Sequence, residues 1–250
     1  DFVNLLNNKY YKTLSPKVQQ LVKELFPKIQ DEDLLTSELI KGNFKPDVFV
    51  SLDNQHENIS IKMGQSNSVH EEKLSNFIDY CQIYLGMDDD TANAFRLFFY
   101  SDGTLDCSGE PSQVLSKASI LKNCCKEMLS IQSFLNENKR VLLERFLVTG
   151  CWRTERNFFA DYLFHGDVSD SDSQWKWASM VSIVDYLVEA KEEKNVVHIG
   201  GLTLQRRAKT DPNKRKILQV KWGSCATDLL KLKELQSQSA SSNNDIIRKF

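Results

Sequence analysis

Apolar residues recur at helical spacing soon after the start of the chain, directly behind Ser15 and Pro16. Serine followed by proline is typical of the first turn of a helix. The apolar positions on one face are Val18, Leu21, Val22, Leu25 and Phe26. This pattern predicts an amphipathic helix that ends near Pro27. A second, shorter helix is expected over residues 32–40, closed by Gly42.

The period then changes from helical spacing to alternation. Residues 48–52 form a compact apolar run, residues 53–56 have turn composition, and Ile59 and Ile61 alternate with polar neighbours. A β-hairpin over 48–62 follows. After a loop over 64–68, Ser68 is placed to cap a helix. The inner face of that helix would be Leu74, Phe77, Ile78, Cys81 and Leu85.

Some of the remaining segments show the spacing of helices and others the alternation of strands. We expect a strand over 95–100 with a bend at Asp102–Gly103, helices over 113–148 and 178–190, and a strand with an acidic loop between those helices. Two strands over 196–208 and 214–222 complete the order. The predicted fold class is therefore α/β, with a mixed central sheet flanked by helices. We expect a single domain over 1–236 and a polar tail over 237–250.

Composition indicates which partners and which cellular compartment to expect for the protein. The formal net charge is −2 over 250 residues, so any anion-binding surface must be local. The six cysteines show no spacing typical of zinc sites or secreted scaffolds, which favours free thiols in a reducing cytoplasm. No apolar run resembles a signal peptide or approaches the ~20 residues of a membrane span. A cytoplasmic protein without a membrane partner is expected.

Four charged side chains stand close together in the hairpin segment. Asp47 precedes its first strand and Lys62 ends its second, so strand pairing can bring both to the same rim of the sheet. Glu71 and Glu72 would open the following helix and can reach that rim. Two carboxylates, with the Ile61 carbonyl between them, offer the oxygen ligands that Mg²⁺ prefers, with Mn²⁺ as a substitute. Such a cation can polarise a phosphodiester, with the lysine holding the attacking water.

The motif Pro46–Asp47 followed by Ser60–Ile61–Lys62 resembles the PD-(D/E)XK nuclease superfamily, which includes many type II restriction endonucleases. Ser60 stands where the pattern has an acidic residue, and some members supply the missing carboxylate from the following helix. The block "ISIKMGQSNSVHEE" is also similar to an S-[IV]-K-x-G-x-x-x-S-V-H-x-E signature of bacterial nuclease-like proteins. That signature places its final glutamate on Glu72 rather than Glu71.

The resemblance implies a Mg²⁺-dependent endonuclease acting on double-stranded DNA, with restriction or phage defence as its expected role. Asp47 and Glu72 would bind the metal, with Glu71 as the alternative ligand, Lys62 would position water, and Ser60 would fill the vacated acidic position. Symmetric cleavage of a duplex requires two sites, which implies a homodimer. The alternative is a nuclease-like DNA-binding module that has lost catalysis, and a structural or protein-binding domain is a third possibility.

A local basic cluster is the best candidate for the DNA backbone footprint. Its members are Arg206, Arg207, Lys209, Lys214, Arg215 and Lys216. The competing interpretation is a charged hairpin edge that prevents aggregation. His70 is a further candidate for a phosphate contact or a metal-shell partner, but a polar residue at a helix start is the favoured interpretation.

Overall fold

The computed structural model describes residues 1–42, 44–64, 67–151, 158–170, 172–190, 197–208 and 211–247. The chain folds into two compact units. Unit 1 contains Asp1–Ser66, Leu147–Ile183 and Cys225–Phe250, and unit 2 contains Asn67–Phe146 and Val184–Ser224. The chain crosses between the two units several times, so neither unit is a continuous segment of sequence. The single domain expected over 1–236 stays a prediction.

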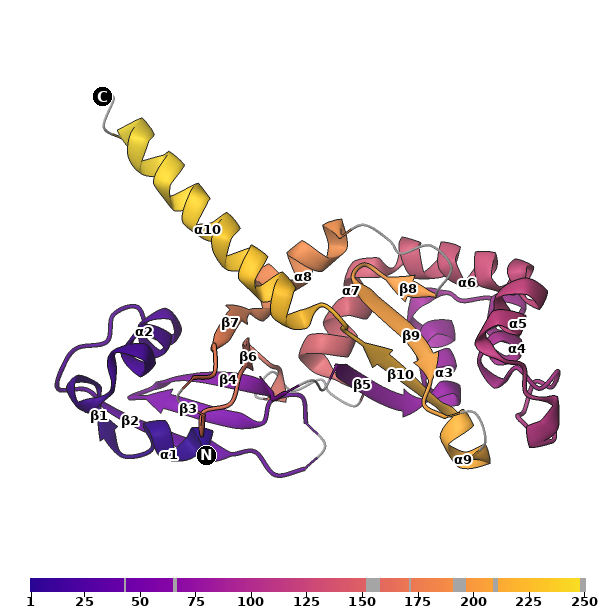
Figure 1. Ribbon diagram of the computed structural model, residues 1–250, viewed down its shortest axis with the longest axis horizontal. Helices are drawn as coiled ribbons and strands as arrows, with labels where there is room; N and C mark the ends of the chain where they lie inside the picture. Colours follow the sequence, from indigo (N-terminus) through magenta and orange to yellow (C-terminus); the bar gives the residue numbers. More distant parts are fainter. Residues whose placement is uncertain are drawn as a thin grey trace. The chain divides into compact units, whose positions relative to one another are not determined.

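Unit 1 is built on a mixed six-stranded sheet. In sheet order the strands are β1 (Lys9–Tyr10), β2 (Leu34–Leu39), β3 (Val48–Leu52), β4 (Gln55–Lys62), β6 (Tyr162–His165) and β7 (Lys176–Ser179). Only the β4–β6 pair of this described sheet is parallel. The helices are α1 (Phe2–Leu6), α2 (Pro16–Leu25), α10 (Cys225–Ile247) and the start of α8 (Met180–Glu189), with a 3₁₀ turn at Tyr11–Thr13 (Figure 1).

The two faces of this sheet differ in character. Residues paired directly across antiparallel strands share a face, so Val48 and Ile59 lie on the same side. This side is apolar and packs with α1 and α2 into one buried cluster that includes Phe2, Leu21 and Phe164. The opposite side carries the odd-numbered positions of β3 and the even-numbered positions of β4. That second face bears the polar residues of the predicted site.

Unit 2 is built on an antiparallel four-stranded sheet covered by helices. Its strand order is β5 (Ser68–Lys73), β10 (Ile217–Lys221), β9 (Leu202–Arg206) and β8 (His198–Ile199). The helices are α3 (Leu74–Leu85), α4 (Asp89–Tyr100), α5 (Lys117–Asn123), α6 (Cys125–Glu137), α7 (Lys139–Glu144), the end of α8 and α9 (Pro212–Arg215), with a 3₁₀ turn at Pro111–Gln113. Phe77 packs edge-on against Phe95 in the core. A π-helical turn, Arg145–Thr149, leads from unit 2 into unit 1.

Several predicted elements are confirmed. The α/β class with a mixed sheet, the helix after Ser15, and the 48–62 hairpin all occur, and the hairpin bends at Asp53 with a φ of 52°. The helical pattern over 113–148 appears as α5, α6, α7 and the π-helical turn. α10 continues as a helix through Ile247, so residues 237–247 of the expected tail are helical.

Three local predictions are wrong because tertiary pairing or capping decides the outcome. Residues 34–39 form strand β2 instead of a helix, since their backbone pairs with β3. Residues 68–73 form strand β5, and the helix expected from Ser68 begins only at Leu74. Residues 95–100 belong to helix α4, whose N-terminus is capped by the Asp88 carboxylate accepting from Thr91 N at 2.7 Å.

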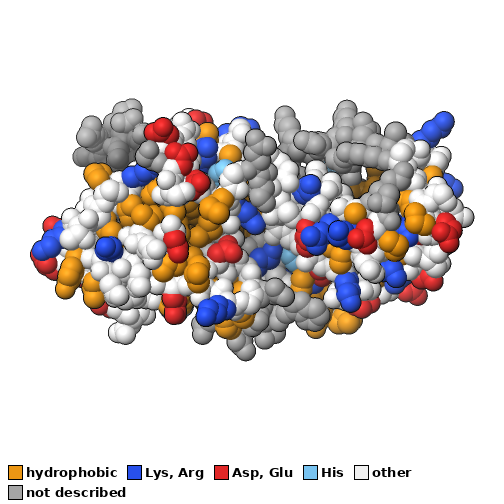
Figure 2. Space-filling model, turned by 60° about the horizontal axis from the view of Figure 1, so that its bottom comes forward, with side chains coloured by type: hydrophobic (Ala, Val, Ile, Leu, Met, Phe, Trp, Pro, Cys, Tyr) orange, Lys and Arg blue, Asp and Glu red, His pale blue; other side chains and the backbone are white. Residues whose placement is uncertain are grey.

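Acidic and basic side chains are interspersed over the molecular face shown in Figure 2, in keeping with the small net charge. All six cysteines are free thiols. Within the described part of the chain, no helix is long and apolar enough to cross a membrane.

Candidate active site

Asp47 lies immediately before β3 and is fixed by contacts with β4. Its backbone N–H donates to the Ile59 carbonyl at 2.8 Å, and its Oδ2 accepts from the Ile61 backbone N–H at 2.6 Å. The Ser60 hydroxyl is 3.5 Å from the same oxygen. The Asp47 carboxylate thus accepts the hydrogen bond that a backbone carbonyl of β3 would accept if the β3–β4 pairing continued. The pairing of the two strands therefore orients this carboxylate.

One oxygen of Asp47 remains open. The side chain is exposed, and among the described residues only Oδ2 has hydrogen-bond partners. An oriented carboxylate with one open oxygen is suited to a hard divalent cation. A turn-capping aspartate is the simpler structural explanation, and it accounts for the contacts of Oδ2.

Lys62 occupies the same sheet face as Asp47 and Ser60. The register pairs Phe49 with Asn58, and positions two residues apart share a face, so Asp47 and Lys62 both belong to the non-apolar side. Ser60 is buried and Lys62 is half-buried. The geometry therefore brings Asp47, Ser60 and Ile61 into contact and leaves Lys62 on their side of the sheet.

His165 is a neighbour that the sequence did not reveal. Parallel pairing of β4 with β6 sets it opposite Lys62, and antiparallel pairing with β7 sets it opposite Lys176. Burial and the positive charge of Lys176 lower the pKa of His165. A neutral imidazole thus lies between two lysines. No local pattern could have found it, because the pairing joins distant stretches of chain.

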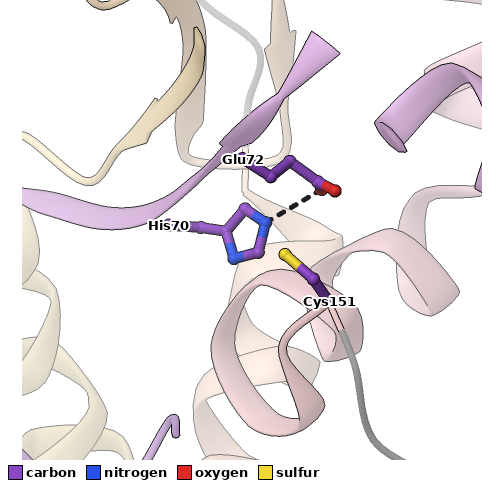
Figure 3. A group of neighbouring side chains, drawn as sticks. All are labelled: His70, Glu72 and Cys151. Carbon is purple, nitrogen blue, oxygen red and sulfur yellow. Dashed lines mark hydrogen bonds and ion pairs between the residues drawn. The ribbon is translucent and has the colours of Figure 1, made fainter. Parts of the chain in front are cut away.

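Glu72 lies in unit 2 in a different environment. It sits on β5, and its side chain is only 2% exposed. One carboxylate oxygen is 2.8 Å from Arg145 Nη2, and the other is 2.9 Å from His70 Nε2, as Figure 3 shows for the histidine. The guanidinium of Arg145 also stacks over the Tyr80 ring at 3.8 Å. Both oxygens of this carboxylate are engaged inside unit 2.

The electrostatics of Glu72 follow from these partners. Burial would raise its pKa, but the hydrogen bond and charge of His70 and the charge of Arg145 outweigh burial and lower the pKa. Arg145 lies directly before the apolar pair Phe146–Leu147 in a largely apolar segment, and this was the available sequence clue to a buried partner. Glu72 is thus a buried carboxylate whose charge is balanced by partners within unit 2, and its role as a metal ligand stays a prediction.

Glu71 points to the other side of β5 and is also paired. Its Oε1 accepts from Gln219 Nε2 at 2.6 Å, and its Oε2 lies 2.9 Å from Arg207 Nη1. Since the two glutamates lie on a strand, the expected delivery of one of them by a helix N-terminus is wrong.

The basic cluster is divided by burial. Arg215 is 2% exposed, donates to the Gly109 carbonyl at 3.0 Å and lies 3.5 Å from Asp102, so burial and internal partners weigh against its predicted role as a DNA contact. Burial weighs in the same way against His70 as a phosphate contact. Arg206 is half-buried and donates to the Leu115 carbonyl at 2.9 Å.

The exposed members of the cluster differ in their partners. Arg207 is paired with Glu71, and Lys214 lies 3.4 Å from Asp211. Lys216 is exposed and has no acidic partner in the described part of the chain. Lys209 lies outside the described residues.

Comparison with known proteins shows a similarity of fold to a solved structure. The chain is similar to the crystal structure of restriction endonuclease MspI in complex with its cognate DNA, with a TM-score of 0.51 and 15% sequence identity. The similarity covers 82% of this chain and 77% of the other. The chain has a restriction endonuclease-like fold. No protein family model and no curated protein sequence matches it.

Proposed function

We propose that this protein is a metal-dependent endonuclease that hydrolyses phosphodiester bonds of double-stranded DNA. The observation that carries the proposal is the oriented Asp47 carboxylate, with one open oxygen, on the sheet face that also holds Lys62. The restriction endonuclease-like fold supports it. The neighbour's structure was determined with its cognate DNA, which makes duplex DNA the substrate to test first.

In this proposal Asp47 and the Ile61 carbonyl hold a divalent cation, Mg²⁺ or Mn²⁺. The bound cation would supply charge neutralisation at the phosphate and a more acidic water, effects worth several kcal/mol of barrier. Lys62 positions the attacking water, and Ser60 holds the Asp47 carboxylate through its hydroxyl. We leave Glu71 and Glu72 out of this ligand set because their carboxylates already have cationic partners.

A catalytically inactive DNA-binding module is the second candidate. The observation that favours it is Ser60, a neutral residue at the position where the resembled motif has an acid. With one carboxylate in the proposed ligand set instead of two, the site would bind a cation more weakly. Metal titration separates the two candidates.

The decisive experiment is cleavage of supercoiled plasmid with Mg²⁺, with Mn²⁺ and with a chelator. The active enzyme nicks or linearises the plasmid only with metal. The matched control is Asp53→Asn, an exposed aspartate at the opposite end of the same hairpin, which should cleave like the wild type. DNA binding without cleavage in either metal would establish the inactive module, and absence of both would reject the proposal.

The oligomeric state is tested separately. Cleavage of both strands in a single binding event requires two active sites, so we propose a homodimer on the duplex. Analytical ultracentrifugation with and without DNA measures this directly, and a monomer at all concentrations would reject the homodimer.

A further inference from the structure

A pocket in unit 2 has not been used in the proposed chemistry. Its volume is about 500 Å³. It is lined by Lys73, Ser75, Tyr100, Asn213, Lys216 and Ile217. Every polar side chain in this lining can donate a hydrogen bond, and the described lining contains no acidic residue. The pocket is therefore suited to an anion.

The sheet of unit 2 brings the two lysines together. Lys73 ends β5 and is register-paired with Ile217, the first residue of β10. The Lys216 carbonyl accepts from the Leu74 backbone N–H at 2.8 Å, so the chain on both sides of the pocket is held by backbone pairing. These contacts fix the bases of two cationic side chains whose residues are far apart in sequence.

The charges of these lysines are not compensated locally. Both side chains are exposed, and neither ammonium has an acidic partner among the residues that the structure describes. Lys214, two residues away, differs because it is paired with Asp211. Helix α3 begins at Leu74 next to the pocket, and no side chain caps its N-terminus. The positive end of this twelve-residue helix adds to the attraction for an anion.

We propose that this pocket binds a phosphate group of the DNA backbone, with Lys73 and Lys216 as the charged contacts. The proposal rests on the proposed function, since it names one phosphate subsite of the same DNA complex. It replaces the broad basic footprint expected from the sequence with a smaller one, in which the unpaired lysines act and the buried arginines do not.

The first arm of the test measures DNA binding by fluorescence anisotropy in the presence of chelator, so that no cleavage occurs. A labelled duplex is titrated with wild-type protein and with the Lys73→Gln, Lys216→Gln double variant at several salt concentrations. If both lysines neutralise one phosphate, the slope of log K against log salt should fall in magnitude by about one unit in the variant. Lys214→Gln is the matched control and should keep the wild-type slope.

The second arm uses inorganic phosphate alone and does not depend on nuclease function. At constant ionic strength, phosphate should raise the melting temperature of the wild type and of Lys214→Gln more than chloride does, and this difference should vanish in the double variant. Circular dichroism checks that all variants are folded.

The two arms distinguish the possible failures. An unchanged salt slope in the double variant overturns the phosphate subsite even if the protein cleaves DNA. If the wild type binds no duplex, the proposed function and the DNA partner both fall, and the phosphate arm then decides the anion site: a lost stabilisation in the variant supports it, and equal stabilisation overturns it.

Discussion

Asp47 and Glu72 are two acidic residues that the sequence motif assigns to one metal site, yet their surroundings are opposite. Asp47 is exposed in unit 1 and held by a backbone N–H, and its Oδ1 has no hydrogen-bond partner among the described residues. Glu72 is buried in unit 2 and has Arg145 and His70 on its two oxygens. The free energy with which a carboxylate binds a cation depends on the charges that already surround it. Two acidic residues that match the same motif can therefore have different roles.

The comparison also separates two uses of a carboxylate. An oriented, solvent-facing anion contributes little to stability and is available to a ligand. A buried anion must be neutralised on folding, and loss of either partner leaves an uncompensated charge. Substitutions at the two sites should therefore affect different properties: catalysis at Asp47 and stability at Glu72.

The largest expected effect is on cleavage. Asp47→Asn removes the negative charge but keeps an oxygen that accepts from Ile61 N–H, so the strand end should stay formed. We expect the rate of metal-dependent cleavage to fall by about a hundredfold or more, and the free energy of unfolding to change by less than about 1 kcal/mol. Plasmid cleavage and urea denaturation measure the two quantities. Cleavage at the wild-type rate would remove Asp47 from the mechanism.

Lys62→Ala should stop hydrolysis in the same assay but leave calorimetric Mg²⁺ binding unchanged, because an ammonium group donates hydrogen bonds and does not ligate a cation. Parallel loss of metal binding would show that the variant disturbs the site itself. The control here is Lys28→Ala, an exposed lysine elsewhere in unit 1.

The next effect is on stability. Glu72→Ala leaves Arg145 buried without a carboxylate, which should cost about 3–5 kcal/mol of unfolding free energy. Glu71→Ala, one residue away and partly exposed, should cost less than about 1 kcal/mol. Urea denaturation of both variants tests the contrast. If Glu72→Ala instead unfolds like the wild type and loses Mg²⁺ affinity, Glu72 is a metal ligand after all.

A smaller effect concerns pH and involves a third carboxylate, Glu57 on β4. Burial and the neighbouring Asp161 carboxylate raise the pKa of Glu57 from 4.5 to about 7. The folded state therefore binds more protons than the unfolded state between these values, and stability falls as the pH rises through that window. Because Glu57 is half-exposed, the loss is discounted to roughly 1 kcal/mol. Melting temperatures of Glu57→Gln across this window should lack the decline that we expect for the wild type.

Glu72 has the opposite pH dependence, since its partners lower its pKa. Its contribution to stability is complete above the unfolded-state pKa and is lost as the pH falls through the folded-state pKa. A pH titration of unfolding thus reports on both carboxylates in different directions.

The local pattern predicted those parts of the fold that local interactions determine. The 48–62 hairpin and helix α2 form where alternation, turn composition and helical spacing agree. Strand β2 was missed because its short sequence is compatible with a helix until β3 pairs with it. Strand β5 was missed for the same reason, since β10 comes from the far end of the chain.

The residues of the candidate site also divide into those placed by local interactions and those placed by contacts between distant parts of the sequence. Asp47, Ser60 and Ile61 lie within one hairpin, and their contact could be anticipated from its register. His165 reaches Lys62 only through a parallel strand pair, and Arg145 reaches Glu72 only through the packing of unit 2. Arg215 is likewise buried beside Asp102, which lies far from it in the sequence. Counting charges along the sequence cannot show that these two residues are close together.

The smallest expected effect distinguishes a paired surface arginine from the unpaired lysines. Arg207 lies 2.9 Å from Glu71, and both side chains are partly exposed, so Arg207→Gln should cost less than about 1 kcal/mol, and high salt should reduce even that difference. Urea denaturation at two salt concentrations measures it. Because Glu71 already compensates its charge, the same variant should leave the salt slope of DNA binding unchanged. A slope reduced by about one unit would instead mean that Arg207 exchanges its carboxylate for a phosphate on binding, and the DNA footprint would then extend along β9.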